Sequence, residues 1–237
     1  MSIDYSIRVS QRARRLQIKI SPMGEVEVVI PEGMAAYHVA PFVEKHHRWI
    51  QQTKSRLFVG LAEYSSNFAC LLPENIVLKV IGGDWSVAYK LRPGLRSSLV
   101  ESESLLQINA PDELVARQVL QRWLSRKARR YLLPLLCQWS DETGLRFQRL
   151  TIRAQKTRWG SCSSIGTISL NRALMFLDQE LVRYLIIHEL CHLRHMNHSR
   201  HFWALVGSFD HEYRDAERRL KCIAPIIPAW VFNAAHC

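Results

Sequence analysis

The sequence predicts an α+β fold, in which a β-rich N-terminal region is followed by a C-terminal region of mixed helices and strands. Apolar residues alternate with polar ones in several short runs before residue 110, as they do in half-buried strands. From Asp112 onward the apolar residues recur at helical spacing instead. The 237 residues are 48% hydrophobic, which is enough apolar content for a packed core. We therefore expect two regions, residues 1–110 and 111–237.

The N-terminal region is expected to begin with a β-hairpin and a helix. Apolar residues alternate over residues 16–20 and 26–30, on either side of the turn-prone residues 21–24. Residues 37–57 have helical spacing. Pro41 fits this helix only because it falls near the first turn.

Three further runs predict a small sheet before the boundary. They lie around residues 76–80, 85–89 and 105–108, and each alternates apolar and polar side chains. Runs so close together along the chain favour an antiparallel meander, which we expect to end at Pro111.

The C-terminal region is predicted to hold two long helices with strands between them. The first helix starts after Asp112, an N-cap residue, and its apolar stripe continues to Trp139. Strands are expected around residues 147–153 and 167–170. The second helix begins near Asp178 and runs through His192.

The chain is strongly basic, with a formal net charge of +11 and a pI near 9.7. This charge favours anionic partners such as nucleic acid, nucleotides or acidic peptides, but it does not choose among them. A solvated helix face is the competing interpretation. Six of the basic residues fall on one predicted helix: Arg117, Arg122, Arg126, Lys127, Arg129 and Arg130.

The start of the sequence and its cysteines predict a cytoplasmic protein. The first residues lack the basic flank and apolar core of a signal peptide, and no apolar run reaches the 18 or so residues of a membrane span. We therefore expect no membrane partner. The six cysteines form no CxxC pair, so we expect reduced thiols. Cys191 lies between two candidate metal ligands, but helical geometry turns it away from their shared face.

The sequence His188-Glu189-Leu190-Cys191-His192 is an HExxH motif on the second long helix. Residues four apart lie one above the other on a helix, so His188 and His192 can bind the same metal ion. Glu189 then points beside the metal, where it can deprotonate a zinc-bound water. The four apolar residues before His188 are typical of a buried helix that opens into a cleft.

A catalytic zinc ion usually has three protein ligands, so a third must be found. His195 would lie about 10 Å along the helix from His188, too far to share one ion. His198 can return toward the metal if the chain turns at Met196 and Asn197. Glu212, Glu217 and His201 remain as alternatives.

Several short motifs occur together in the C-terminal region, at residues 158–164, 168–171, 188–192, 197–199, Phe202 and Trp203. Their combination resembles the YgjP-like metallopeptidases, which are relatives of the SprT-like and WLM domains. The resemblance implies zinc bound by His188, His192 and His198, with Glu189 as the catalytic residue. It also implies a minimal zincin fold, with helices packed on a short mixed sheet whose edge strand borders the cleft. The spacing of the three histidines also matches the metzincin pattern, but His195 stands where metzincins have a glycine.

The segment from Arg158 to Asn171 contains the candidate substrate-binding residues, which are Arg158, Ser169 and Asn171. A guanidinium beside a zinc cleft can hold a substrate carboxylate or phosphate. We also expect the strand at residues 167–170 to pair with an extended peptide.

These observations favour a zinc metallopeptidase that acts on a peptide or protein. One alternative is a metal-dependent hydrolase of nucleotide phosphoanhydrides, with arginines binding phosphate. Another is a nucleic-acid-associated protein on a zincin scaffold. The intact Glu189 argues against the last, because a structural zinc site has no need of a base.

Overall fold

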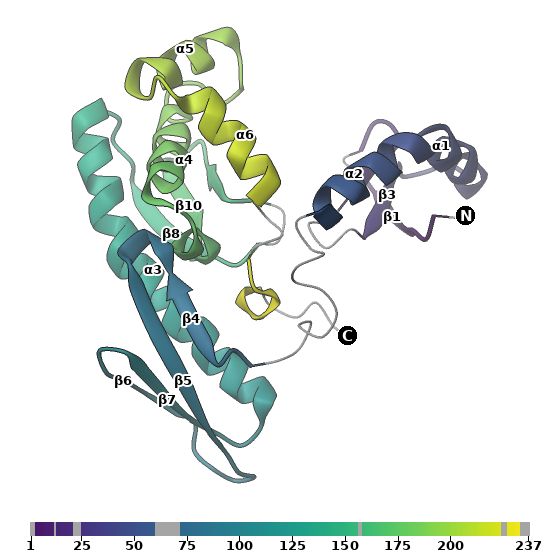
Figure 1. Ribbon diagram of the computed structural model, residues 1–237. Helices are drawn as coiled ribbons and strands as arrows, with labels where there is room; N and C mark the ends of the chain where they lie inside the picture. Colours follow the sequence, from purple (N-terminus) through teal and green to yellow (C-terminus); the bar gives the residue numbers. More distant parts are fainter. Residues whose placement is uncertain are drawn as a thin grey trace. The chain divides into compact units, whose positions relative to one another are not determined.

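A computed structural model describes residues 3–11, 13–20, 25–59, 72–155, 158–223 and 227–232, without the side chains of residues 36 and 54–59. The chain forms two compact units (Figure 1). The first comprises Met1–Ser66 with Cys222–Ile226, and the second Asn67–Lys221 with Ile227–Cys237. The division thus falls earlier than the boundary expected near residue 110. The change of periodicity there marks the passage from sheet to helix inside the second unit.

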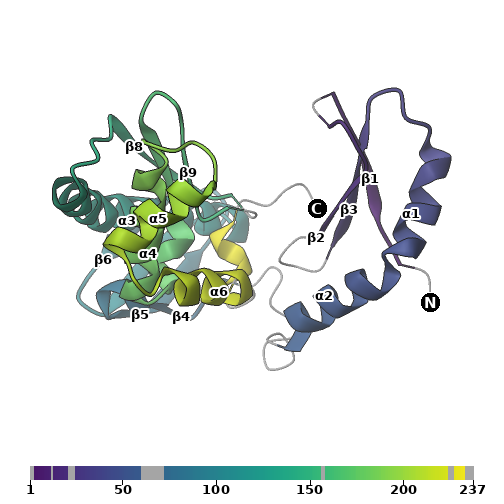
Figure 2. The same cartoon turned by 90° about the horizontal axis from the view of Figure 1, so that it is seen from above.

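The first unit is a three-stranded sheet with helices on one face (Figure 2). Strands β2 (Gln17–Ile20) and β3 (Val26–Pro31) pair antiparallel, as expected for the predicted hairpin, whose turn at residues 21–24 lies outside the described residues. Strand β1 (Ser6–Ser10) pairs parallel to β3 on its other side. The alternation of apolar and polar residues did not predict the pairing of β1 with β3.

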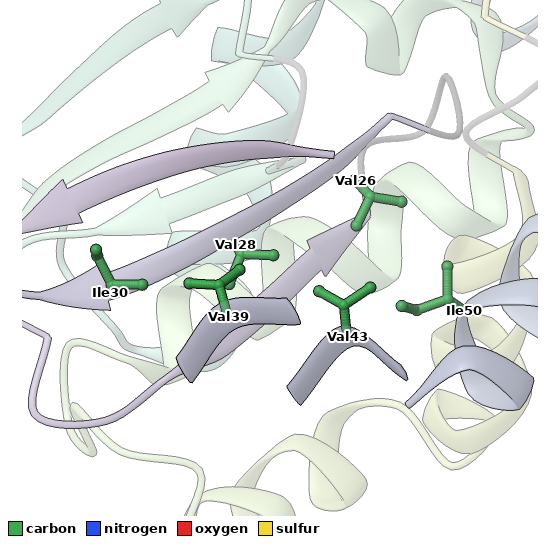
Figure 3. Packing of buried hydrophobic residues seen from close by; sticks show 6 residues of the cluster. All are labelled: Val26, Val28, Ile30, Val39, Val43 and Ile50. Carbon is green, nitrogen blue, oxygen red and sulfur yellow. The ribbon is translucent and has the colours of Figure 1, made fainter. Parts of the chain in front are cut away.

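The predicted helix of residues 37–57 is a short 3-10 turn, η1 (Ala36–His38), followed by α1 (Val39–Lys45) and α2 (His47–Val59). Pro41 falls in the first turn of α1, where its missing N–H costs no helical hydrogen bond. The helices bury apolar side chains against the strands (Figure 3). This core comprises Val26, Val28 and Ile30 of the sheet and Val39, Val43 and Ile50 of the helices.

The second unit begins with a four-stranded sheet in the order β4-β5-β7-β6. Its strands are β4 (Asn75–Leu78), β5 (Gly83–Leu91), β6 (Ser98–Glu101) and β7 (Leu105–Ala110). The expected antiparallel meander is wrong, because β5 and β7 pair parallel. The short strand β6, which the sequence did not predict, pairs antiparallel with β7 at the edge of the sheet. The other side of β7 is therefore free to pair with β5. Val80 belongs to a 3-10 turn, η2 (Lys79–Ile81), and not to a strand.

Helix α3 (Glu113–Thr143) connects this sheet to the part of the unit that holds the HExxH motif. Asp112 caps it as predicted, since its side chain accepts a hydrogen bond from the backbone N–H of Val115 at 2.8 Å. The helix packs against both β7 and the following strand β8 (Arg149–Arg153). It therefore supports both sheets of the unit.

The second sheet of this unit has the order β8-β10-β9, with β9 at Gly160–Cys162 and β10 at Thr167–Asn171. β10 is parallel to β8 and antiparallel to β9. The expectation that residues 167–170 pair with a peptide is wrong, because β10 is the central strand and both of its edges are already occupied. β9 is the edge strand nearer the motif, since it packs against helix α4 (Gln179–Cys191).

The remaining elements complete a mixed α+β architecture. A 3-10 turn, η3 (Arg172–Phe176), precedes α4, and α5 (Arg200–Phe209) and α6 (Tyr213–Ile223) follow it. A final turn, η5 (Ala229–Val231), lies near the end of the described chain. Among the described helices, none combines the length and the apolar character that crossing a membrane requires.

Candidate metal centre

The HExxH motif lies at the C-terminal end of α4. The helix is buried over most of its length, and its last residue is Cys191, with His192 still in helical conformation as the C-cap. The chain then turns at residues 192–194 and bends at 196–197 before α5 begins. The side chain of Ser199 caps α5, so His198 is held between the bend and a fixed helix start.

Three histidine side chains converge at this turn. The Nε2 atoms of His188 and His198 lie 3.0 Å apart, and one ligand atom from each of His188, His192 and His198 lies within 4.8 Å of the others. Two nitrogens bound to one tetrahedral zinc ion at 2.0–2.1 Å would be about 3.4 Å apart. The spacing of these three imidazoles therefore fits a single metal ion.

The second ring nitrogens of two of these histidines have protein partners. His192 Nδ1 donates to the backbone carbonyl of His195 at 3.0 Å, and His188 Nδ1 lies 3.3 Å from the Tyr184 hydroxyl. A proton on Nδ1 leaves the lone pair of Nε2 for the metal. The hydrogen bond to the His195 carbonyl thus sets His192 in the tautomer that a metal ligand needs. At His188 the Tyr184 hydroxyl is placed to accept a hydrogen bond from Nδ1 in the same tautomer.

Aromatic side chains of α5 fix the planes of the rings. Phe202 is fully buried and stacks on His192, with ring centroids 4.5 Å apart and planes 26° apart. The ring centroid of Trp203 lies 5.5 Å from that of His198, and the Trp203 ring also stacks on Tyr213. Packed rings of this kind restrict imidazole rotation, which keeps the three nitrogens facing one point.

The electrostatics of the cluster favour neutral imidazoles. Burial, together with the smaller effects of the neighbouring His192 and His198, lowers the pKa of His188 to about 3. Burial also lowers the pKa of His192, partly opposed by the hydrogen bond to the His195 carbonyl. Neutral imidazole is the form that binds metals, so these rings do not need to lose a proton at neutral pH.

Glu189 follows His188 on α4 and is only 4% exposed. Its Oε2 atom is buried and has no hydrogen-bond partner among the described residues. Burial raises the pKa of this carboxyl group to about 8, while the positive charge of Arg158 partly opposes the rise. A buried carboxylate with an unsatisfied oxygen is costly, and a water or substrate group at the metal site would satisfy it.

The alternative third ligands do not join the group of converging ligand atoms. The ring of His195 faces that of His201, with centroids 6.2 Å apart, and only its backbone carbonyl contacts the cluster. Glu217 pairs with Lys221 at 2.8 Å, and Glu212 is exposed. The geometry therefore favours His198, the residue after the predicted bend.

The two cysteines near the cluster are protonated thiols. Cys191 is fully buried, and burial raises its pKa to about 12. Burial and the charge of Glu189 raise the pKa of Cys162 to about 11. Neither side chain belongs to the group of converging ligand atoms, which is formed by the three histidines.

Two of the three candidate substrate-binding residues do not face this site. Asn171 is 3% exposed, and its amide donates to the carbonyls of Gln155 and Arg158 while its Oδ1 accepts from the N–H of Ala173. It therefore anchors the segment that leads into β9.

Ser169 points to the other face of the sheet. It pairs across the strands with Ser161, and its hydroxyl lies 2.7 Å from that of Thr151. Successive strand residues face opposite sides, and a side chain at Gly160 would point at Glu189. Ser161 and Ser169 consequently face away from Glu189. Arg158, which is exposed and acts electrostatically on Glu189, is the one of the three that the structure brings to the site.

We expect Asn171→Ala to destabilise the protein by about 3 kcal/mol, because it leaves buried backbone groups without their partner. Ser169→Ala, on the same strand, is expected to cost less than about 1 kcal/mol. Denaturant unfolding measures both. If Asn171→Ala kept the stability and raised only KM, Asn171 would be a substrate-binding residue as the sequence suggested.

Tyr184 was not predicted from the sequence, although a signal for it existed. It lies four residues before His188 and therefore on the same helical face, where a hydroxyl can reach the imidazole. Burial raises the pKa of Tyr184, with smaller contributions from nearby acidic groups, so the hydroxyl stays protonated.

A cavity of about 430 Å³ lies elsewhere in the second unit, beside α3. Its lining has no histidine, carboxylate or thiol, so it offers neither a metal ligand nor a general base. The lining residues are Gln118, Gln121, Arg122, Ser125, Arg126 and Arg172. Among the described residues, the histidine cluster and not this cavity therefore offers a set of metal ligands.

Comparison with known proteins agrees with the chemistry of this cluster. A family model described as YgjP-like, metallopeptidase domain, matches residues 14–222. The metallopeptidase zymogen of Pyrococcus abyssi abylysin is 33% identical over 38% of this chain and 90% of its own, with a TM-score of 0.35. The metallopeptidase zymogen of Methanocaldococcus jannaschii jannalysin is 22% identical over 38% of this chain and 92% of its own, with a TM-score of 0.34. No curated protein matched the chain. Because the family match spans most of the sequence, including the three histidines and Glu189, this chain belongs to the YgjP-like family of metal-dependent peptidases.

Proposed function

We propose that the protein is a zinc-dependent peptidase in which His188, His192 and His198 hold the metal and Glu189 is the general base. The observation that carries the proposal is the convergence of three imidazoles beside a buried carboxyl group with an unsatisfied oxygen. A general base needs this position, next to the metal but outside its ligand set.

The donor set supports zinc as the metal. Imidazole nitrogen suits zinc, copper, iron and nickel, whereas magnesium and calcium prefer oxygen ligands. Three protein ligands with one position left open are typical of catalytic zinc. Closed structural zinc sites normally have four.

In this proposal the histidines hold the metal and Glu189 transfers the proton. A zinc ion held by the histidines would polarise the scissile carbonyl and make a bound water more acidic. Glu189 takes the proton of the attacking water and later delivers it to the leaving amine. Its raised pKa suits a group that must carry a proton between these steps.

The position of β9 supports a peptide as substrate. The carbonyl of Trp159 and the N–H of Ser163 form hydrogen bonds with the β10 side of the sheet. Backbone groups of successive residues in an antiparallel strand point to alternate sides, so the N–H and C=O groups of Gly160 and Cys162 point to the free outer edge of β9. An extended peptide that pairs with this edge would lie alongside Glu189.

The test is an activity screen of the purified protein against peptide and nucleotide libraries, with the metal content measured by elemental analysis. We expect about one zinc ion per chain. Peptide cleavage should be lost with a chelator and restored by added zinc. Metal-dependent hydrolysis of nucleoside triphosphates without any peptide cleavage would replace the proposal by the phosphoanhydride alternative.

A further inference from the structure

Strand β9 passes unusually close to Glu189 at Gly160. A Cβ atom built on Gly160 would lie 2.6 Å from Oε1, 2.8 Å from Cγ and 2.9 Å from Cδ of Glu189. Real Cβ atoms essentially never come within 3.0 Å of another heavy atom. Any side chain at this position would therefore displace the carboxyl group or the strand.

Neither partner of this contact can move easily. Glu189 is 4% exposed on a buried stretch of α4, so few other side-chain conformations are open to it. Gly160 is paired with Leu170 of the central strand, and the preceding carbonyl of Trp159 accepts a hydrogen bond from the N–H of Asn171 at 2.8 Å. The position of β9 is thus set by the same sheet that supports α4.

The backbone at Gly160 does not itself require glycine. The described glycines with positive φ are Gly33, Gly82, Gly94, Gly144 and Gly166, and Gly160 is not among them. Alanine is acceptable in an extended strand of this kind. Glycine is needed at position 160 for space, and the space it leaves is filled by the carboxyl group of Glu189.

We propose that Gly160 is a positioning residue, whose missing side chain lets β9 hold the Glu189 carboxyl group in the one orientation in which it can serve as base. The kinetic part of this inference rests on the proposed function, because it requires Glu189 to be the base. The steric part does not. A displacement of about 1 Å at a catalytic group can slow a reaction about 10²-fold, which is the scale expected for Gly160→Ala.

The steric part is tested by thermal unfolding of the metal-free protein. Gly160→Ala should lower Tm by on the order of 5 °C, as overpacking does in a protein of this size. In a Glu189→Ala background the same substitution should lower Tm by less than half as much, because the methyl group then has room. Ser161→Ala, whose side chain is on the other face of the sheet, is the matched control and should change Tm little in either background.

Equal losses of Tm in the two backgrounds would overturn the inference. If Gly160→Ala alone does not fold, the double variant should, and an unfolded double variant would also overturn it.

The kinetic part is tested with the zinc-loaded protein on a peptide substrate. Gly160→Ala should lower kcat with little change in KM, and it should have no further effect once Glu189 is replaced by glutamine. A Gly160→Ala variant with full kcat would overturn the positioning role. If Glu189→Gln itself kept full activity, the proposed function would fail, while the unfolding measurements would still decide the contact.

Discussion

Replacement of Glu189 by glutamine is expected to slow peptide hydrolysis by about 10²–10⁴-fold and to leave the metal bound. The physical reason is that Glu189 lies beside the three converging imidazoles and not among them. Glutamine keeps the size of the side chain and removes the base. The measurement is kcat together with zinc content by elemental analysis on the same preparation.

Glu180→Gln is the matched control for this experiment. Glu180 lies on the same helix but is exposed, and its partner is Arg219 at 3.1 Å. Its replacement should leave both rate and metal content unchanged. If Glu189→Gln lost zinc, Glu189 would be a ligand, and if it kept full activity, the general-base mechanism would have to be given up.

Loss of the third ligand is expected to have the second large effect. His198→Ala removes one of three converging nitrogens, so zinc affinity should fall by more than the roughly 10–100-fold typical of losing an outer partner of a ligand. His195→Ala should have little effect, because His195 serves the site through its backbone carbonyl, which alanine retains. Competition with a chelator of known affinity gives the ranking.

His201→Ala provides a second control, since the His201 ring faces His195 and not the cluster. If either control lowered zinc affinity more than His198→Ala, the ligand set would be wrong. A loss shared equally by all three variants would indicate general loosening of the turn before α5.

Short-range features of the site could be predicted from the sequence. The spacing of His188 and His192 follows from helical periodicity, and the return of His198 follows from a reversal of only a few residues. The cap at Asp112 and the start of α4 depend on equally local signals. All of these are set within about ten residues along the chain.

Features that depend on strand order could not be predicted in the same way. The parallel pairing of β5 with β7 depends on the short strand β6, whose few residues have little periodicity. The placement of Ser169 away from Glu189 could not be foreseen, because alternation shows which residues share a face but not which face meets α4. The contact of Gly160 with Glu189 joins residues 29 positions apart and becomes visible only when β9 is placed beside the helix.

The fluorescence of Trp203 is expected to report metal binding at the histidine cluster. The indole ring centroid lies 5.8 Å from that of His188 and 5.5 Å from that of His198. Indole fluorescence responds to the charge and rigidity of groups at this distance, and both change when an imidazole takes up a metal ion. Ion uptake can therefore be followed by emission intensity in the unlabelled protein. Trp203→Phe would separate this signal from that of the other tryptophans among the seven in the chain.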